Sequence, residues 1–222
     1  MMDGNGWQKI TVNGNKHMSN KNVIGIGGAA RSGKDTFASI VEMKLQQAGK
    51  SVKKVAFADP LKQHCDKFLL ENLGISAFTQ VPEEKILIRP MLVWYGDAQR
   101  KRTNGRYWID LAKKTIEESN YDYYIVTDVR YDVYEKDELY FLKSETKGVL
   151  CHISKYSIID GEKKFVLPAN DHEEANNPKI KSAAQHRVEW EDEGKMTTEE
   201  LLLNPKLNEH VEKFMKIWIK EF

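Results

Sequence analysis

One segment constrains the fold of this chain more than any other feature of its sequence. Residues 28–36 read GAARSGKDT and fit the pattern G-x-x-x-x-G-K. The apolar run at 23–28 ends in glycines and predicts a buried strand that opens into a tight turn. Behind the segment, a helix that ends at Gly49 is predicted by the spacing of Phe37, Ile40, Val41, Leu45 and Ala48. A strand, a glycine-rich turn and a helix start in this order indicate a phosphate-binding loop.

The residue types in this loop suit a nucleotide phosphate. Glycines let backbone N–H groups turn inward around phosphate oxygens, and the helix start adds unpaired donors and the positive end of its dipole. Lys34 is expected to reach the β- and γ-phosphates. We therefore assign ATP binding to Gly28, Arg31, Ser32, Gly33, Lys34, Asp35 and Thr36.

Asp35 departs from the usual form of the motif. The hydroxyl that commonly follows the lysine and binds Mg²⁺ is replaced by this carboxylate, and Thr36 comes one place later. A carboxylate beside a triphosphate is repelled unless it faces Mg²⁺ or its waters. We expect Asp35 to hold hydrated Mg²⁺ or to orient an acceptor group, and Thr36 to donate to the α-phosphate. The alternative for Asp35 is a plain acidic residue in a first helical turn, where the dipole favours it.

Further apolar runs alternate with helical segments along the chain. Strands are predicted at 52–58, 121–128, 149–154 and 186–190. The alternation implies a parallel sheet with helices on both faces, and hence one three-layer α/β domain at 21–222 after a loose tail at 1–20. Ligands in such folds bind beyond the carboxyl ends of the strands, so four positions that follow predicted strands should share one edge: Gly28, Asp59, Asp128 and the loop after Ser154.

A helical insertion is predicted at about 60–119. Asp59 should cap its first helix, with Pro60 at the first position, where the missing N–H costs nothing. Further on, the insertion should be interrupted by Pro90 and by a turn at Asn104-Gly105.

The second half of the chain is less regular. A polar helix is expected from Asp132, and 155–182 shows Gly, Pro and Asn breaks without periodicity, which predicts a loop-rich lid at about 154–182. The chain should end in an amphipathic helix that buries Leu207, Val211, Phe214, Met215, Trp218, Ile219 and Phe222.

Charged residues at the predicted edge suggest the rest of the site. Asp128 ends a strand where P-loop enzymes place a metal-side aspartate, and Arg130 follows it; the alternative is a capping aspartate with a surface arginine. Lys62 is expected to border the acceptor site. Guanidinium groups suit phosphates, and aromatic faces suit a base. Such residues interleave between 89 and 108: Arg89, Trp94, Tyr95, Arg100, Lys101, Arg102, Arg106, Tyr107 and Trp108.

Alternative interpretations apply to several of these residues. Ordinary core packing is the favoured interpretation for Trp94, Tyr95, Trp108, Trp190 and Trp218, and a solvated helix end explains the block at 100–102. His172 and Glu174 lie in the predicted lid, where a histidine is usually exposed and inert.

Bulk composition excludes several classes of protein. The 222 residues carry a formal net charge of +1, without the basic surplus that nucleic-acid binding requires. The two cysteines lie far apart and predict reduced structural thiols in a cytoplasmic protein. The sequence has no apolar run of the roughly 20 residues that cross a membrane. We expect small-molecule partners and a monomer or homodimer.

Taken together, these residues resemble the phage-type deoxynucleoside monophosphate kinases. The matching segments, spread over most of 22–190, are GAARSGKDT, DPLK at 59–62, the stretch from Arg89 through Gly96-Asp97 to Tyr107-Trp108, YDYYIVTDVR at 121–130 and, more weakly, His172-x-Glu174. Animal-type phosphomevalonate kinases are similar at the same places. The chain departs from the phage pattern at Asp59, where a glycine is common, and in a shorter stretch between Lys62 and Arg89.

The resemblance implies a P-loop kinase fold and a nucleotide kinase that uses ATP and Mg²⁺. The γ-phosphate would move to a deoxynucleoside monophosphate, with Lys34, Asp35, Asp128 and Arg130 catalytic and Asp35 and Asp128 at the metal. The acceptor would lie against Lys62, Arg89, Trp94, Gly96, Asp97, Arg100, Arg130, His172 and Glu174. Two alternatives stay open: a kinase of a non-nucleotide phosphate such as phosphomevalonate, and a P-loop ATPase or nucleotide switch. No hydrolytic glutamate follows Asp128, which counts against the ATPase.

Overall fold

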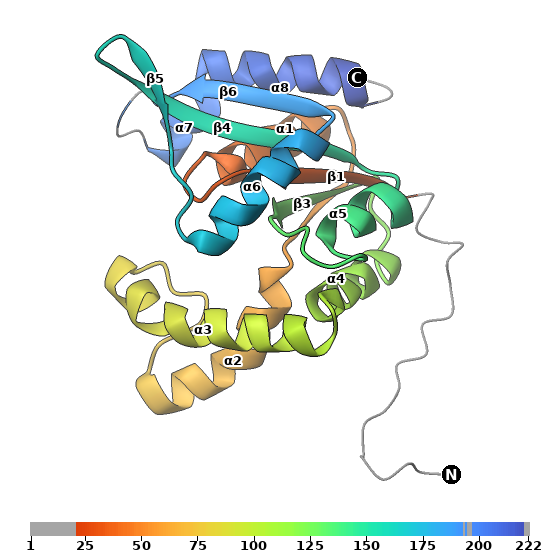
Figure 1. The fold of residues 1–222 in the computed structure, drawn as a ribbon. Coiled ribbons are helices and arrows are strands. Elements are labelled where there is room, and N and C mark those ends of the chain that lie inside the picture. Colours follow the sequence, from red (N-terminus) through yellow and green to blue (C-terminus); the bar gives the residue numbers. More distant parts are fainter. Residues whose placement is uncertain (1–20, 193, 195–196, 220–222) are drawn as a thin grey trace.

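A mostly parallel sheet forms the centre of the molecule in the computed structural model, which describes residues 21–192, 194 and 197–219 (Figure 1). Five strands run parallel in the order β2-β3-β1-β4-β6, and β5 pairs antiparallel with the far end of β4. Their bounds are β1 Asn22–Gly27, β2 Val52–Val55, β3 Tyr123–Val129, β4 Val149–Ile159, β5 Glu162–Phe165 and β6 His186–Glu191.

Helices cover both faces of this sheet because its strands present apolar side chains alternately to either side. On β3, Tyr123 and Ile125 face one cluster, and Tyr124 and Val126 face the other. The first cluster is closed by α1 (Lys34–Gln47), α7 (Thr198–Leu203) and α8 (Pro205–Trp218). The second is closed by α4 (Arg106–Glu117), α5 (Glu138–Tyr140), the π-helix η2 (Phe141–Glu145) and α6 (Asp171–Ala183). The predicted three-layer α/β architecture is confirmed.

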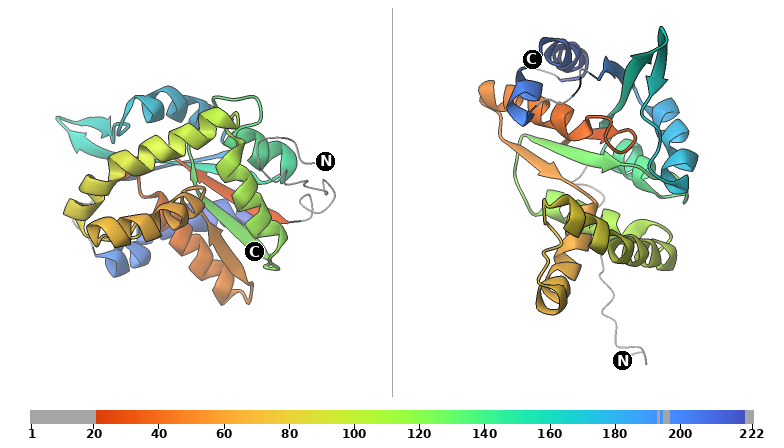
Figure 2. Two further views of the ribbon diagram at one scale, coloured as in Figure 1. Left: turned by 90° about the horizontal axis from the view of Figure 1, so that it is seen from below. Right: turned by 90° about the vertical axis from the view of Figure 1, so that its left-hand side faces the viewer.

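Two helices lie apart from the sheet. Figure 1 and the right-hand view of Figure 2 show α2 (Ala58–Leu73) and α3 (Pro82–Arg102) below it. A small core of their own holds them together: Cys65, Leu69, Ala77 and Ile88. Within the predicted insertion at 60–119, only these two helices therefore stand away, because α4 buries its apolar face on the sheet.

The expected interruption at Pro90 is wrong. The helix α3 runs through Pro90 for 21 residues and ends before the predicted turn at Asn104-Gly105. Proline removes one intrahelical hydrogen bond. In α3 this loss is offset by packing on both sides, since Ile88 is buried in the α2–α3 core and Gly96 is buried beyond it.

Asp59 does not cap α2 as predicted. The helix begins one residue earlier, at Ala58, and Asp59 lies inside the first turn. The carboxylate of Asp128, at the end of β3, instead accepts hydrogen bonds from the N–H groups of Phe57 (2.9 Å) and Ala58 (3.1 Å). The cap thus comes from another strand, and β2 stops at Val55 rather than extending to residue 58.

The expectation of a loop-rich segment at 155–182 is also wrong. β4 continues to Ile159, a hairpin turn follows at Asp160-Gly161, and β5 returns along it. Both turn residues have positive φ (53° and 79°), as an Asp-Gly hairpin turn requires. The helix α6 then runs to Ala183 through Pro178, so the predicted lid region consists of a hairpin and a helix.

No long helix starts at Asp132. Asp137 caps the three-residue α5, and the π-helix η2 follows directly. The Asp137 side chain also accepts N–H bonds from Val133 and Tyr134, which holds this segment in a turn instead of a helix.

The end of the chain agrees with the sequence in most respects. β6 is present, and α8 buries Leu207, Val211, Phe214 and Met215, with Ile219 beyond its last turn. Trp218 stays 38% exposed, contrary to the prediction. Phe222 and the predicted tail at 1–20 lie outside the described residues. Both cysteines are buried free thiols. No helix in the described part of the chain is long and apolar enough to span a membrane.

Candidate active site

The loop between β1 and α1 has the tight geometry that its sequence predicts. Gly33 has a φ of 89°, and a Cβ atom there would lie 2.4 Å from Trp190 Cζ2. The Trp190 indole N–H donates to the Ser32 carbonyl at 2.9 Å. Trp190, on β6, is buried as core packing predicts, and it also forms a wall against which the loop is pressed.

Lys34 lies inside this loop. It is buried, and its ammonium donates to the Ala29 carbonyl at 2.6 Å. Burial lowers the pKa of Lys34 to about 8; the positive charge of Arg130 adds to this shift, and three carboxylates oppose it, those of Asp35, Glu173 and Asp128. Three other predicted catalytic residues, Asp35 on α1 and Asp128 and Arg130 at the end of β3, therefore act on this ammonium group.

One side-chain oxygen of the loop is buried without a hydrogen-bond partner among the described residues. The Ser32 hydroxyl is buried and forms no hydrogen bond with any described residue. Buried hydroxyl groups are nearly always hydrogen-bonded in folded proteins, because desolvating them without a partner is costly. An oxyanion held by the loop would supply the missing acceptor.

A cavity of about 260 Å³ opens beside the loop. Four predicted nucleotide-binding residues line it, together with residues from β4, β6, the segment after β6, and α7: Arg31, Gly33, Asp35, Thr36, Lys155, Trp190, Asp192, Gly194 and Leu201. On its wall, Lys155 pairs with Asp192 at 3.0 Å and lies over the Trp190 ring.

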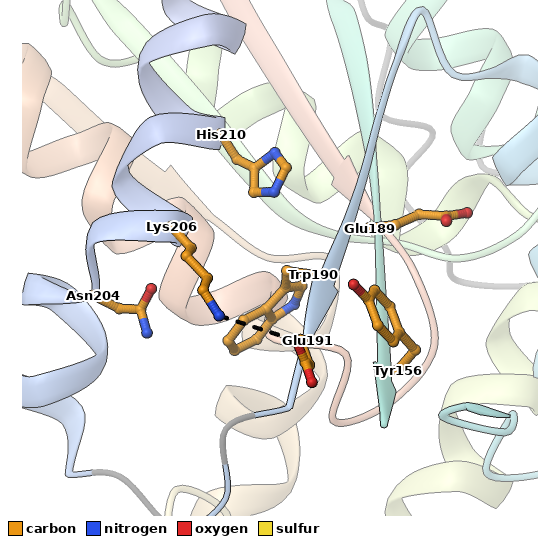
Figure 3. A pocket seen from close by; sticks show the side chains of 7 residues that line it. All are labelled: Tyr156, Glu189, Trp190, Glu191, Asn204, Lys206 and His210. Atoms are coloured by element: carbon orange, nitrogen blue, oxygen red, sulfur yellow. Dashed lines mark ion pairs between the residues drawn. The ribbon is translucent and has the colours of Figure 1, made fainter. Parts of the chain in front are cut away.

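A second cavity, of about 220 Å³, shares Trp190 with the first. Figure 3 shows the side chains around it: Tyr156, Glu189, Trp190, Glu191, Asn204, Lys206 and His210. Trp190 thus borders both cavities and contacts the phosphate loop.

The end of β3 positions Arg130. The N–H groups of Arg130 and Tyr131 donate to the buried Glu138 carboxylate at 2.6 and 2.9 Å. Burial raises the pKa of Glu138 to about 8, while Arg100 opposes the rise. The Arg130 guanidinium extends toward α6 and pairs with Glu173 at 2.9 Å.

The carboxylates that could hold a metal ion are Asp35 and Asp128. Asp35 is exposed, lines the 260 Å³ cavity and forms no hydrogen bond with a described side chain. Each oxygen of Asp128 accepts one N–H bond and keeps a free lone pair. Among the described residues no group of three His, Cys, Asp or Glu could hold a metal. Mg²⁺ commonly uses one or two carboxylates plus substrate phosphates, so this donor set fits Mg²⁺ that arrives with a nucleotide.

Arg100 is engaged within the protein. Its guanidinium is buried, pairs with Asp137 (2.8 Å) and Glu138 (3.3 Å), and stacks 3.9 Å from the Tyr131 ring centre. These contacts tie α3 to the segment after β3. The prediction placed Arg100 among the acceptor-binding residues, and the geometry gives it an anchoring contact.

The other predicted acceptor residues on α2 and α3 differ in their surroundings. Gly96 accepts the Trp108 indole N–H on its carbonyl, and Asp97 pairs with Lys101. Lys62 lies over the ring of Phe78. The core-packing interpretation of Trp94 is wrong, since 69% of this residue is exposed.

Arg89 is exposed and has no hydrogen bond or ion pair with a described residue. It precedes Arg100 by 11 residues, which places both on the same side of α3. Arg100 on that side contacts residues beyond the end of β3, and Arg89 lies about 16 Å from it along the helix axis.

On α6, the predicted site residues lie on either side of the residue that contacts the phosphate loop. His172 and Glu174 are exposed, whereas Glu173 is buried and accepts the Ala30 N–H of the phosphate loop. The available signal was helical spacing, because Glu173, Asn176 and Ile180 form the buried face of α6. Because a loop was expected at 155–182, this helical spacing was not used in the prediction.

Comparisons with known proteins add little to this geometry. No protein-family model matches the chain, and no curated protein matches it closely enough to count as a relative. Among solved structures, a shikimate kinase from Acinetobacter baumannii in complex with shikimate is similar, with 11% identity, a TM-score of 0.41, and coverage of 92% of this chain and 96% of that chain.

Proposed function

We propose that this protein is a phosphotransferase that moves the γ-phosphate of ATP to a small phosphorylated acceptor. The observation that carries the proposal is the phosphate loop, where a buried lysine, a glycine at which a Cβ atom would clash with Trp190, and a Ser32 hydroxyl without a described partner lie together. Backbone N–H groups and a cation arranged in this way bind a polyphosphate.

The cavity beside the loop supports ATP as the donor. Arg31, Asp35 and Thr36 line this cavity and belong to the predicted phosphate-binding segment, so the cavity adjoins the phosphate site. Mg²⁺ bound with the nucleotide would be held by Asp35, and by Asp128 through water, and would neutralise part of the phosphate charge.

Transfer is favoured over hydrolysis by the residues at the end of β3. Val129-Arg130-Tyr131 follow Asp128, so the sequence has no glutamate directly after Asp128 to activate a water. A phosphate oxygen of the acceptor is already a nucleophile at neutral pH and needs no general base. Arg130, and Arg89 on α3, are cations suited to bringing a second phosphate close to the first. With the family resemblance, this favours a deoxynucleoside monophosphate as acceptor.

The test is an acceptor panel assayed with MgATP. We expect product with at least one deoxynucleoside monophosphate, and little ATP turnover without acceptor. Lys34→Ala should lower turnover at least about a hundredfold while the protein stays folded by circular dichroism, because it removes one preorganised transition-state donor.

Three results would contradict the proposal in different ways. Use of phosphomevalonate but no nucleotide would refute the acceptor and keep the kinase. Rapid ATP hydrolysis without any acceptor would favour an ATPase or nucleotide switch. Wild-type turnover in a folded Lys34→Ala protein would remove the phosphate loop from the site.

A further inference from the structure

The carboxylate of Glu173 joins three parts of the chain that lie far apart in sequence. One oxygen accepts the N–H groups of Ala30, in the phosphate loop, and of Ala169, before α6, both at 3.0 Å. The other oxygen accepts from Arg130 Nη1, beyond β3, at 2.9 Å. Glu173 is 7% exposed, so these contacts are made away from bulk water.

Glu173 is held as an anion. Burial by itself would raise its pKa, but the N–H bonds from Ala169 and Ala30 and the charges of Arg130 and Lys34 outweigh burial and lower the pKa. A buried carboxylate beside a phosphate site is tolerated because two cations flank it.

The Arg130 side chain depends on this carboxylate. Glu138 fixes only the backbone N–H of Arg130, and Glu173 is the one described residue that binds the guanidinium. The remaining guanidinium donors have no partner among the described residues, and the side chain is 37% exposed. One edge of the fork is therefore held by the protein and the rest is open to a ligand.

We propose that Glu173 is a positioning residue that holds the Arg130 guanidinium at the phosphate loop, with its free N–H groups presented to the phosphate of the acceptor. The inference rests on the proposed phosphotransferase function. It assigns to α6 a role in assembling the site, because the same carboxylate binds the start of α6 to the loop.

The first experiment compares Glu173→Gln with Asp171→Asn. Both convert a carboxylate of the first turn of α6 to an amide, but Asp171 is exposed and touches neither the loop nor Arg130. Glu173→Gln should lower kcat/KM for the acceptor about 10- to 100-fold, the effect of losing a charged hydrogen bond, and change the Kd of ATP less than about threefold. Asp171→Asn should leave both unchanged.

A double-mutant cycle with Arg130→Lys separates positioning from a general structural role. If Glu173 acts through Arg130, then Glu173→Gln should have little further effect on kcat/KM once Arg130 is replaced. Asp171→Asn should remain additive with Arg130→Lys. Additive losses for Glu173→Gln would overturn the proposal.

A measurement that does not depend on turnover tests the positioning role of Glu173 separately from the proposed kinase activity. The side-chain Nη–H NMR signals of Arg130, identified by their loss in Arg130→Lys, should differ from those of free arginines in the wild type, because Nη1 donates to Glu173, and should move to the position of free arginines in Glu173→Gln. An unchanged signal would refute the positioning role even in an active kinase. Failure of the wild type to use any acceptor would refute the kinase and leave the NMR result standing.

Discussion

At the scale of single residues, Gly33 shows how backbone conformation and a neighbour act together. Its φ of 89° disfavours any side chain, and Trp190 leaves no space for a Cβ atom, since the nearest ring atom would lie 2.4 Å away. Gly49, at the end of α1, has a φ of 76° but no atom within 4 Å of the same position. A side chain at either position would strain the backbone, but only at Gly33 would it also clash with a neighbour.

We predict that Gly33→Ala will weaken ATP binding at least about tenfold, because the loop must move away from Trp190 and lose at least one charged hydrogen bond to phosphate. The matched variant Gly49→Ala should lose about 1–2 kcal/mol of folding free energy from the left-handed backbone alone and bind ATP as the wild type does. Calorimetric titration with ATP and urea unfolding measure the two effects. Wild-type ATP affinity in Gly33→Ala would show that the loop does not bind the phosphates.

At the scale of secondary-structure elements, the ends of β3 and α3 are joined by buried charges. Arg100 from α3 meets Asp137 and Glu138, and Glu138 in turn binds the backbone at Arg130 and Tyr131. Removing one partner of a buried ion pair leaves an uncompensated charge, which costs far more than loss of an exposed pair.

Arg100→Met should therefore destabilise the protein by about 3–5 kcal/mol, seen as a lower urea midpoint. Lys101→Met is the control, since Lys101 is exposed and pairs only with Asp97 on the same helix, and it should leave the midpoint near that of the wild type. A stable Arg100→Met protein with a raised KM for the acceptor would instead support the predicted acceptor-binding role.

At the scale of the whole molecule, the sheet and the α2–α3 pair are stabilised unequally. The two clusters on the sheet contain most of the buried side chains, whereas the separate core of α2 and α3 has four: Cys65, Leu69, Ala77 and Ile88. Nine large apolar side chains on or between these two helices remain exposed: Phe68, Leu70, Leu73, Phe78, Val81, Ile86, Leu87, Val93 and Trp94. Local opening requires least free energy where few apolar contacts are lost.

Amides of α2 and α3 should therefore exchange with solvent deuterium faster than those of β1 and β3 under native conditions. An acceptor that binds against α3 should slow this exchange, since a ligand that binds only the closed form stabilises it. Hydrogen-exchange mass spectrometry resolves these segments. Equal protection of α2–α3 and the central strands would contradict the prediction.

How much the sequence alone could predict depended on the distance between interacting residues. The phosphate loop lies within nine consecutive residues, and its glycines, lysine and flanking elements are local signals. The alternating strands and helices and the buried face of α8 were likewise visible as periodicity. The hairpin at Asp160-Gly161 was also signalled locally, but the Gly, Pro and Asn residues around it hid the strands and α6.

Only the tertiary structure decided the partners of the charged residues. The sequence predicted Asp128, Arg130 and Arg100 near the site. It did not predict that Asp128 caps α2 or that Arg100 anchors α3. The sequence indicated His172 and Glu174 instead of Glu173, because the partners of Glu173 are remote: Ala30 lies 143 positions away and Arg130 lies 43 positions away. Local patterns specify the helices, strands and turns because their contacts lie within a few residues. A carboxylate takes its role from whichever donors the fold brings to it, and no local pattern encodes those donors.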